Sequence, residues 1–271
     1  FYITLFLFME MLAPNSKKFI RGFSSRHPSL IRAALLISAA LILADAAYLA
    51  VKDKYATDLK ITAIDVGQGS STLVQMPRGI YMLIDGGGFH DSSFDVGSSV
   101  VAPLLYAKRL TKIDIVVLTH PHPDHLQGLI HVLNYFDVRE VWWTGLKADD
   151  DLFRLFEKTI NDRKITVKSL SSQSSPEKIS GVFFECLWPL YPPFQKNQTT
   201  SYDETNDASL VMKITFGSTR FLVTGDISGK VESHLIHSGQ HLKSDLLFVP
   251  HHGSLHSSSE DFIRAVSCRF A

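Results

Sequence analysis

Four side chains of the kinds that bind metal ions lie within six consecutive residues of this sequence. They are His120, His122, Asp124 and His125, in the stretch His-Pro-His-Pro-Asp-His. Imidazole and carboxylate groups together suit zinc, manganese or iron. The alternating prolines impose an extended backbone, in which side chains two residues apart point the same way, so we expect His120 and His122 to form a pair. Asp124 and His125 follow where a helix begins, and they can face a second point.

Three other segments, each an apolar run that ends in polar residues, supply groups that this cluster lacks. Asp226 ends the run Phe-Leu-Val-Thr-Gly-Asp and is suited to bridge two metal ions. His251 and His252 follow another apolar run, and one of them would complete the coordination of the second metal ion. Because neighbours in an extended chain face opposite ways, the other would contact substrate or a carboxylate behind the ligands. Asp85 ends a third run and is expected to orient a metal-bound histidine.

Each of these elements, taken alone, has an ordinary structural explanation. Gly-Asp after a strand is usually a turn, paired histidines often lie on a surface by accident, and Asp-Gly-Gly usually forms a hairpin. So dense a set of ligand side chains at residues 120–125 has little structural use. Its occurrence in order with Asp226 and the pair at 251–252 therefore favours a site for two divalent metal ions.

The elements that must position these residues are strands in two series, with helices between them. Strands are predicted at residues 59–66, 71–76, 80–84, 113–118, 138–142 and 165–170, and then at 181–187, 209–216, 220–224 and 246–249. Helices are predicted at 126–136 and 151–162, and residues 189–207, with three prolines, are predicted to be a long loop. This order predicts an α/β fold in which two sheets pack face to face under helices.

A hydrophobic segment precedes this domain. Residues 33–51 carry one charge, Asp45, and have about the length that a transmembrane helix needs. A signal peptide and a buried helix of a soluble protein are the alternatives. Residues 1–13 are typical of the end of another hydrophobic helix, and a basic loop lies between the two segments. Five basic side chains precede the span: Lys17, Lys18, Arg21, Arg26 and Arg32. By the positive-inside rule they place that side in the cytoplasm and the chain after residue 56 outside.

Charge and cysteine content exclude two classes of protein. The chain is neutral overall, but residues 1–56 hold seven basic and three acidic side chains, whereas residues 57–271 hold 20 basic and 24 acidic ones. The larger part is therefore not a basic platform that would bind nucleic acid by electrostatics alone. The two cysteines, Cys186 and Cys268, provide no disulfide framework.

The signature His-x-His-x-Asp-His at residues 120–125 resembles that of the metallo-β-lactamase fold superfamily. More narrowly, this part of the chain is similar to the C-terminal hydrolase domain of ComEC-type competence proteins, the inner-membrane DNA uptake channels of bacteria. The matching stretches are residues 64–69, 83–87, 120–125, 206–211, 224–226 and 251–254. The resemblance implies an αββα sandwich that follows a transmembrane helix in the bacterial inner membrane. The positive-inside rule, applied above, puts this domain on the extracytoplasmic side. It also implies a proposed nuclease that degrades the strand of incoming DNA that is not taken up.

The sequence departs from the family's pattern in ways that bear on the site. Ser70 follows Gly-Gln-Gly, where the family usually has an acid. The wider superfamily often supplies a third histidine to the first metal from a mid-chain loop, but here no histidine lies between His131 and His234. Asn206 or Asp207, in the corresponding region, is expected to take its place or to bind substrate. The chain ends within an apolar run, so we expect a membrane segment at 1–56 and a C-terminally truncated hydrolase domain at 57–271.

These observations together predict hydrolysis of a phosphodiester by two divalent ions, zinc or manganese. The predicted metal ligands are His120, His122, Asp124, His125, Asp226 and one of His251 and His252. Asp124 and Asp85 are the catalytic candidates, and Gln68, Asn206 and Ser254 are the candidates to contact substrate. Single-stranded or duplex DNA is the expected substrate. The membrane and other parts of a DNA uptake channel are the expected partners.

Two other functions stay open on this sequence. The same site could hydrolyse another ester, as esterases, lactonases and phosphocholine hydrolases of this fold do, because a fold does not determine function. The domain could also shape or gate a DNA channel without turnover, which the missing histidine favours and the complete cluster at 120–125 opposes. Metal content separates this last hypothesis from the other two, and substrate profiling separates those two.

Overall fold

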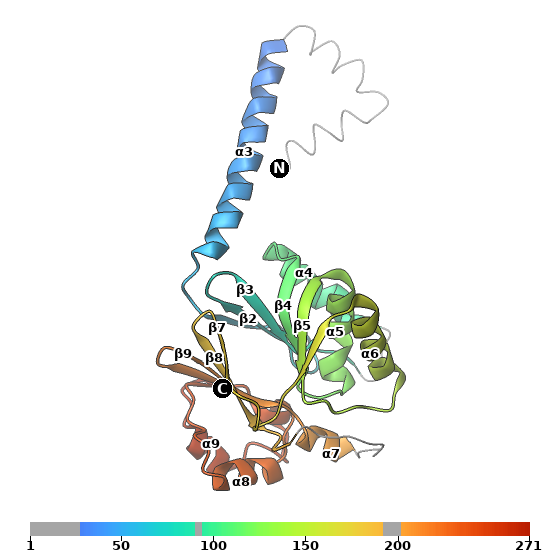
Figure 1. Cartoon of the computed structure of the whole chain (residues 1–271), viewed down its shortest axis with the longest axis vertical. Coiled ribbons are helices and arrows are strands. Elements are labelled where there is room, and N and C mark those ends of the chain that lie inside the picture. Colours follow the sequence, from blue (N-terminus) through green and yellow to red (C-terminus); the bar gives the residue numbers. More distant parts are fainter. Residues whose placement is uncertain (1–27, 90–93, 192–201) are drawn as a thin grey trace. The chain divides into compact units, whose positions relative to one another are not determined.

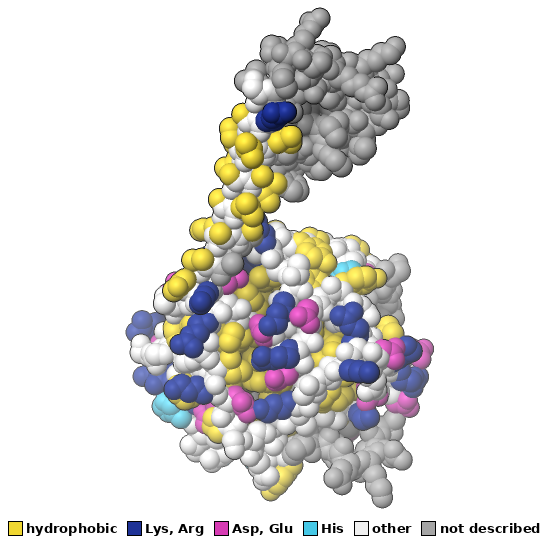
Figure 2. Space-filling model, turned by 45° about the horizontal axis from the view of Figure 1, so that its top comes forward, with side chains coloured by type: hydrophobic (Ala, Val, Ile, Leu, Met, Phe, Trp, Pro, Cys, Tyr) yellow, Lys and Arg dark blue, Asp and Glu magenta, His cyan; other side chains and the backbone are white. Residues whose placement is uncertain are grey.

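A computed structural model of the chain describes residues 28–89, 94–191 and 202–271. The chain divides into two compact units, Phe1–Ala56 and Thr57–Ala271. The described part of the first unit is one helix, α3 (Pro28–Lys54), and by length and composition its stretch Arg32–Lys54 is long and apolar enough to cross a membrane. Hydrophobic side chains cover the visible face of this helix in Figure 2. The predicted apolar segment at 1–13 and the basic residues from 17 to 26 lie outside the described residues.

The first sheet of the second unit has six strands in the order β1-β2-β3-β4-β5-β6. Their bounds are β1 Lys60–Ala63, β2 Thr72–Met76, β3 Ile80–Ile84, β4 Lys112–Val117, β5 Asp137–Trp143 and β6 Thr166–Ser169. Strands β3 to β6 pair in parallel, so their carboxyl ends share one edge of the sheet. The helices beside this sheet (Figure 1) are α4 Ala102–Ala107, which continues the π-helical turn Gly97–Val101, α5 Pro123–Tyr135 and α6 Asp151–Arg163.

The second sheet has five strands in the order β11-β10-β9-β8-β7. Their bounds are β7 Glu177–Ile179, β8 Val182–Trp188, β9 Val211–Phe216, β10 Thr219–Val223 and β11 Leu246–Leu247. The helices on its side of the domain (Figure 1) are α7 Tyr202–Asp207, α8 Gly229–His237 and α9 Glu260–Val266. Strands β10 and β11 pair in parallel, which sends both of their carboxyl ends to the same edge.

Alternation along the strands divides the apolar side chains into three layers. In β4, Val116 packs with the helices of the first sheet, whereas Ile115 and Val117 pack between the two sheets. In β10, Phe221 joins the layer between the sheets and Leu222 packs with α8 and α9. Because side chains alternate between the faces of a strand, each sheet is buried on both faces. The αββα sandwich expected from the sequence is therefore confirmed.

The predicted elements differ from the structure mainly where helices are short. The long loop predicted at 189–207 is wrong at its end, where α7 forms, while residues 192–201 lie outside the described part. Helices α8 and α9 were missed, although Ser228 and Ser259 cap them by accepting hydrogen bonds from backbone N–H groups. The strand predicted at 246–249 ends at Leu247, shortly before Pro250, which cannot donate a backbone hydrogen bond.

Candidate metal centre

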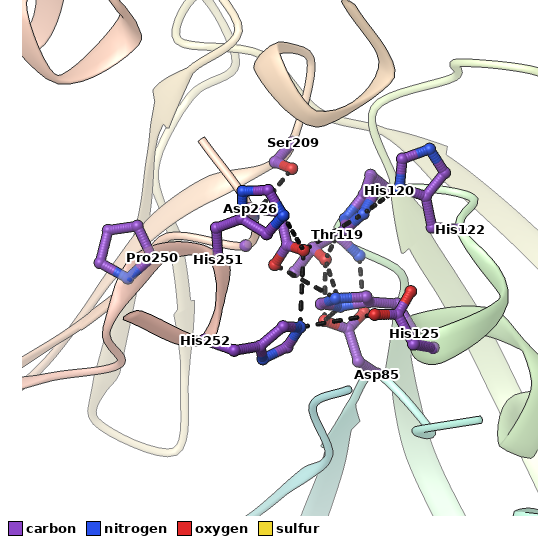
Figure 3. A network of polar contacts seen from close by, with 12 residues as sticks. Asp85, Thr119, His120, His122, His125, Ser209, Asp226, Pro250, His251 and His252 are labelled. Carbon is purple, nitrogen blue, oxygen red and sulfur yellow. Dashed lines mark hydrogen bonds and ion pairs between the residues drawn. The ribbon is translucent and has the colours of Figure 1, made fainter. Parts of the chain in front are cut away.

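The predicted ligands converge from four strand ends that belong to both sheets. Asp85 follows β3, residues 118–125 follow β4, Asp226 follows β10, and residues 250–253 follow β11. Parallel strands present their carboxyl ends at one edge, where α/β proteins place their ligand sites. Figure 3 shows the side chains from these ends facing one another around Asp226.

One group of side chains has the composition and spacing of a metal site. Asp124, His125, Asp226 and His252 each offer one ligand atom, and these atoms lie within 4.8 Å of one another. His125 Nε2 is 3.2 Å from Asp226 Oδ1. His252 Nε2 is 3.5 Å from Asp124 Oδ2 and 3.5 Å from Asp226 Oδ2. Two carboxylates and two imidazoles at this spacing can surround one divalent ion.

A second group lies beside the first, near the same carboxylate. His120 Nε2 is 3.1 Å from His122 Nδ1, and both rings are buried. His120 Nε2 is also 3.9 Å from Asp226 Oδ2. Asp226 therefore faces both groups of ligand atoms, which is the position of a carboxylate shared by two ions.

The protonation states of this cluster suit metal binding. Burial lowers the pKa of His120 well below 6.5 and that of His122 to about 4, so both imidazoles are neutral at pH 7. Burial alone would raise the pKa of Asp124, but its hydrogen bond with His252 and the charge of His125 bring it down to about 2. Neutral imidazoles and ionised carboxylates are the forms that bind metal ions.

His125 behaves differently because it lies between two carboxylates. Burial opposes its charge, but Asp226 and Asp85 together raise the pKa of His125 well above 6.5. Asp85 Oδ2 is 2.8 Å from His125 Nδ1, and it also accepts a hydrogen bond of 2.7 Å from the Thr119 hydroxyl. Asp85 thus fixes the ring so that Nε2 points at Asp226, and a metal ion that binds Nε2 has to displace a proton there.

The side chains of the site have the donor atoms that divalent metal ions bind, and one buried oxygen there lacks a hydrogen-bond partner among the described residues. This oxygen is Asn206 Oδ1, one of the buried side-chain atoms, among the residues described, that form no hydrogen bond. A buried polar atom without a partner is costly, and an ion within reach of the atom removes that cost. The sequence pattern of the metallo-beta-lactamase superfamily matches residues 64–149, which contain Asp85 and the whole cluster at 120–125. This chain carries a metallo-β-lactamase domain.

Curated relatives match most of the chain that holds the metallo-β-lactamase domain. ComE operon protein 3 of Bacillus subtilis (strain 168) is 26% identical over 224 residues, which are 78% of this chain and 28% of that protein. Competence protein ComA of Neisseria gonorrhoeae is 28% identical, over 78% of this chain and 26% of that protein. Uncharacterized protein YcaI of Escherichia coli (strain K12) is 29% identical, over 77% of this chain and 24% of that protein. The chain spans about a quarter of the length of these relatives.

The histidine pair of the metallo-β-lactamase domain sits in a turn rather than in extended chain. His251 and His252 have φ of 50° and 51° within the 3-10 segment Pro250–Gly253. The expectation that they face opposite ways is therefore wrong, since it assumed extended backbone. Both Nε2 atoms face the same carboxylate oxygen, Asp226 Oδ2, at 3.9 Å from His251 and 3.5 Å from His252. Ser254, a predicted substrate contact, donates its backbone N–H to the His251 carbonyl and so lies beside the pair.

The Gly-Gln-Gly loop packs directly on the start of α5. A Cβ atom built on Gly69 would lie 1.7 Å from the Asp124 carbonyl oxygen, and the Ser70 N–H donates to that oxygen at 3.2 Å. Gln68, another predicted substrate contact, is exposed on this loop, and its carbonyl accepts a hydrogen bond from the Gly88 N–H. The loop therefore fixes the backbone of Asp124 and leaves the Gln68 side chain free to meet a ligand.

Two polar residues of the site had no predicted role. The Thr119 N–H and hydroxyl donate to Asp85 at 2.8 and 2.7 Å, and the hydroxyl lies within 3.3 Å of His125 Nδ1. Ser209 Oγ accepts the Asp226 N–H at 3.1 Å. Their places directly before His120 and within the matched stretch 206–211 are the signals that could have identified them. Thr119 thus holds Asp85, which contacts His125, and Ser209 holds the backbone of Asp226.

The structure separates the two candidates for the missing third ligand. Asp207 Oδ1 accepts hydrogen bonds from the Ser228 N–H at 3.2 Å and the Ser228 hydroxyl at 2.6 Å, at the start of α8. Its carboxylate is therefore engaged outside the cluster. Asn206 is buried, and its side chain contacts His122.

Proposed function

We propose that the metallo-β-lactamase domain hydrolyses phosphodiester bonds of DNA with two divalent ions, zinc or manganese, during DNA uptake across a bacterial inner membrane. The observation that carries the catalytic part is the position of Asp226. Its Oδ1 atom faces His125, and its Oδ2 atom faces both His252 and His120. Two ligand groups joined by one carboxylate form the arrangement that two-metal hydrolases use.

Each residue has a defined task in this proposal. The ions, held by His120, His122, Asp124, His125, Asp226 and His252, would supply Lewis acidity and make water nucleophilic near neutral pH. Asp85 holds the ring of His125 through Nδ1 and so keeps Nε2 directed at the centre. Gln68 and Ser254, which lie beside Asp124 and the histidine pair, are placed to contact the substrate backbone. The net negative charge of residues 57–271 does not repel a phosphate from the centre, because two ions add about +4 locally.

The relatives and the first unit support DNA uptake as the setting. Two of the relatives are named ComE operon protein 3 and Competence protein ComA. In this proposal residues 1–56 form a membrane segment and residues 57–271 the hydrolase domain. By the positive-inside rule, the basic residues that precede α3 in the sequence support an extracytoplasmic position for the domain. Other parts of the longer protein would form the channel that delivers the strand.

Cleavage of DNA by the full chain, purified in detergent, tests this proposal. We expect single-stranded or duplex DNA to be cut when manganese or zinc is added, and Asp226→Ala to reduce cutting to background. Asp162→Ala is the matched control, because this aspartate lies on α6 with its side chain 60% exposed and outside the centre. Cutting that survives in Asp226→Ala would refute the assignment. Bound metal without cutting of DNA would favour another ester, and a chain that binds no metal would favour a role without turnover.

A further inference from the structure

The two ligand groups around Asp226 are not equally complete. The group of Asp124, His125 and His252 supplies one carboxylate and two imidazoles in addition to Asp226. Among the described residues, the neighbouring group supplies His120 and His122, and no histidine lies between residues 131 and 234 of the sequence. Two imidazoles and a shared carboxylate leave at least one position of a four-coordinate ion to another donor.

The second sheet brings one segment against the incomplete group. The Leu210 N–H donates to the Thr119 carbonyl at 2.9 Å, directly before His120. The Ser209 N–H donates to the Asn206 carbonyl at 2.9 Å, which closes a turn at the end of α7. The turn therefore fixes Asn206 close to the loop that carries the two histidines. Asn206 is 3% exposed, so its carboxamide is enclosed there.

The carboxamide of Asn206 has an oxygen without a partner. Its Oδ1 is a buried atom that forms no hydrogen bond among the described residues. The side chain contacts the ring of His122. An unpartnered oxygen is therefore enclosed beside the ligand group. Asp207, the other candidate for the missing ligand, accepts a hydrogen bond from the Ser228 hydroxyl instead.

We infer that Asn206 Oδ1 is the ligand that completes the coordination of the ion held by His120 and His122. This inference rests on the two-metal centre proposed above. An amide oxygen is a harder donor than a third imidazole, and hard oxygen donors favour manganese or magnesium relative to zinc. This position is consequently the weaker zinc site of the two, and its choice of metal depends on one side chain.

His251 is the rival donor. Its Nε2 lies 3.9 Å from Asp226 Oδ2, and the side chain is 27% exposed. Asn206 Oδ1, in contrast, is buried and forms no hydrogen bond among the described residues. The test therefore includes both residues.

Metal titration of the full chain in detergent, stripped with a chelator, tests the inference by calorimetry with manganese and with zinc. We expect two ions in the wild type. In Asn206→Ala the weaker one should be lost, or its affinity should fall by at least the roughly 10- to 100-fold that removal of an outer partner costs. Asn206→Asp should retain manganese at this position, and Asn206→His should strengthen zinc binding there. His251→Gln should leave both ions in place, and circular dichroism should show all variants folded.

The outcomes separate this inference from the proposed function. Two ions with unchanged affinities in Asn206→Ala, or loss of an ion in His251→Gln but not in Asn206→Ala, would overturn the ligand assignment and leave the two-metal hydrolase standing. Gain of zinc affinity in Asn206→His supports the assignment even if Asn206→Ala folds poorly. A wild type that binds no ion would overturn both proposals.

Discussion

Substitution of Gly69 by alanine should damage the metal centre through the backbone of Asp124. Gly69 has φ of +84°, and a Cβ atom there would lie 1.7 Å from the Asp124 carbonyl oxygen and 2.6 Å from its carbon. Contacts under 3.0 Å are not seen for real Cβ atoms, so the start of α5 or the glycine loop has to move by about 1.3 Å. A misplacement of about 1 Å in an active site can cost roughly 100-fold in rate.

The control for this substitution is Gly217→Ala in the turn between β9 and β10. Gly217 also has positive φ, +58°, but no atom lies within 4 Å of the added Cβ. Both variants carry the left-handed strain of about 1–2 kcal/mol, and only Gly69→Ala carries the clash. We measure manganese affinity by calorimetry and hydrolysis of bis(p-nitrophenyl) phosphate, with thermal unfolding to compare strain. Equal affinities and rates in the two variants would show that Gly69 does not set the position of Asp124.

Three other predictions follow from the geometry of the domain. Asp85→Asn should weaken metal affinity by roughly 10- to 100-fold in calorimetry, because an amide cannot hold the His125 ring as a carboxylate does, and unchanged affinity would contradict this. In chelator-treated protein, a folded-state pKa of about 4 for His122, below the unfolded value of 6.5, should lower the free energy of unfolding by about 3 kcal/mol as pH falls from 6.5 to 4. The free energy of unfolding measured with urea should therefore depend less steeply on pH in His122→Gln than in the wild type. An equal pH dependence in the two proteins would show that His122 is not the cause. Burial raises the pKa of the Cys186 thiol to about 12, so a thiol reagent at pH 8 should modify Cys268 in the folded chain and reach Cys186 only after unfolding.

The parts of the site that could be predicted from the sequence are those that local rules determine. Residues 120–125 hold four ligand-type side chains in one short stretch, and the prolines there impose extended backbone at His122, which has φ of −78° and ψ of 150°. Apolar strands that end in polar residues marked Asp85 and Asp226 at the sheet edge. These signals depend on neighbours in the chain, which a single sequence displays directly.

The features that the sequence did not reveal depend on backbone conformation and on contacts between distant segments. Left-handed φ at His251 and His252 is uncommon outside glycine, and although histidine adopts it more often than most residues, that preference is too weak to predict it for two neighbours. The roles of Asn206 and Asp207 could not be separated, because the hydrogen bonds of Asp207 to Ser228 join residues 21 positions apart. Helix α7 has six residues, too few for a periodic pattern to identify it.

The arrangement of the centre explains why its two halves depend on each other. Thr119 donates hydrogen bonds to Asp85, and Asp85 in turn holds the ring of His125. The Thr119 carbonyl accepts the N–H of Leu210, which belongs to the segment that carries Asn206. Ser209 in the same segment accepts the N–H of Asp226, the carboxylate that faces both ligand groups. The first sheet supplies three histidines and the second supplies the shared carboxylate, so neither sheet alone holds a complete ligand set. The hydrogen bond from Leu210 to Thr119 joins the two sheets directly beside the bonds that position the ligands, so the packing of the sheets at this edge brings the two halves of the ligand set together.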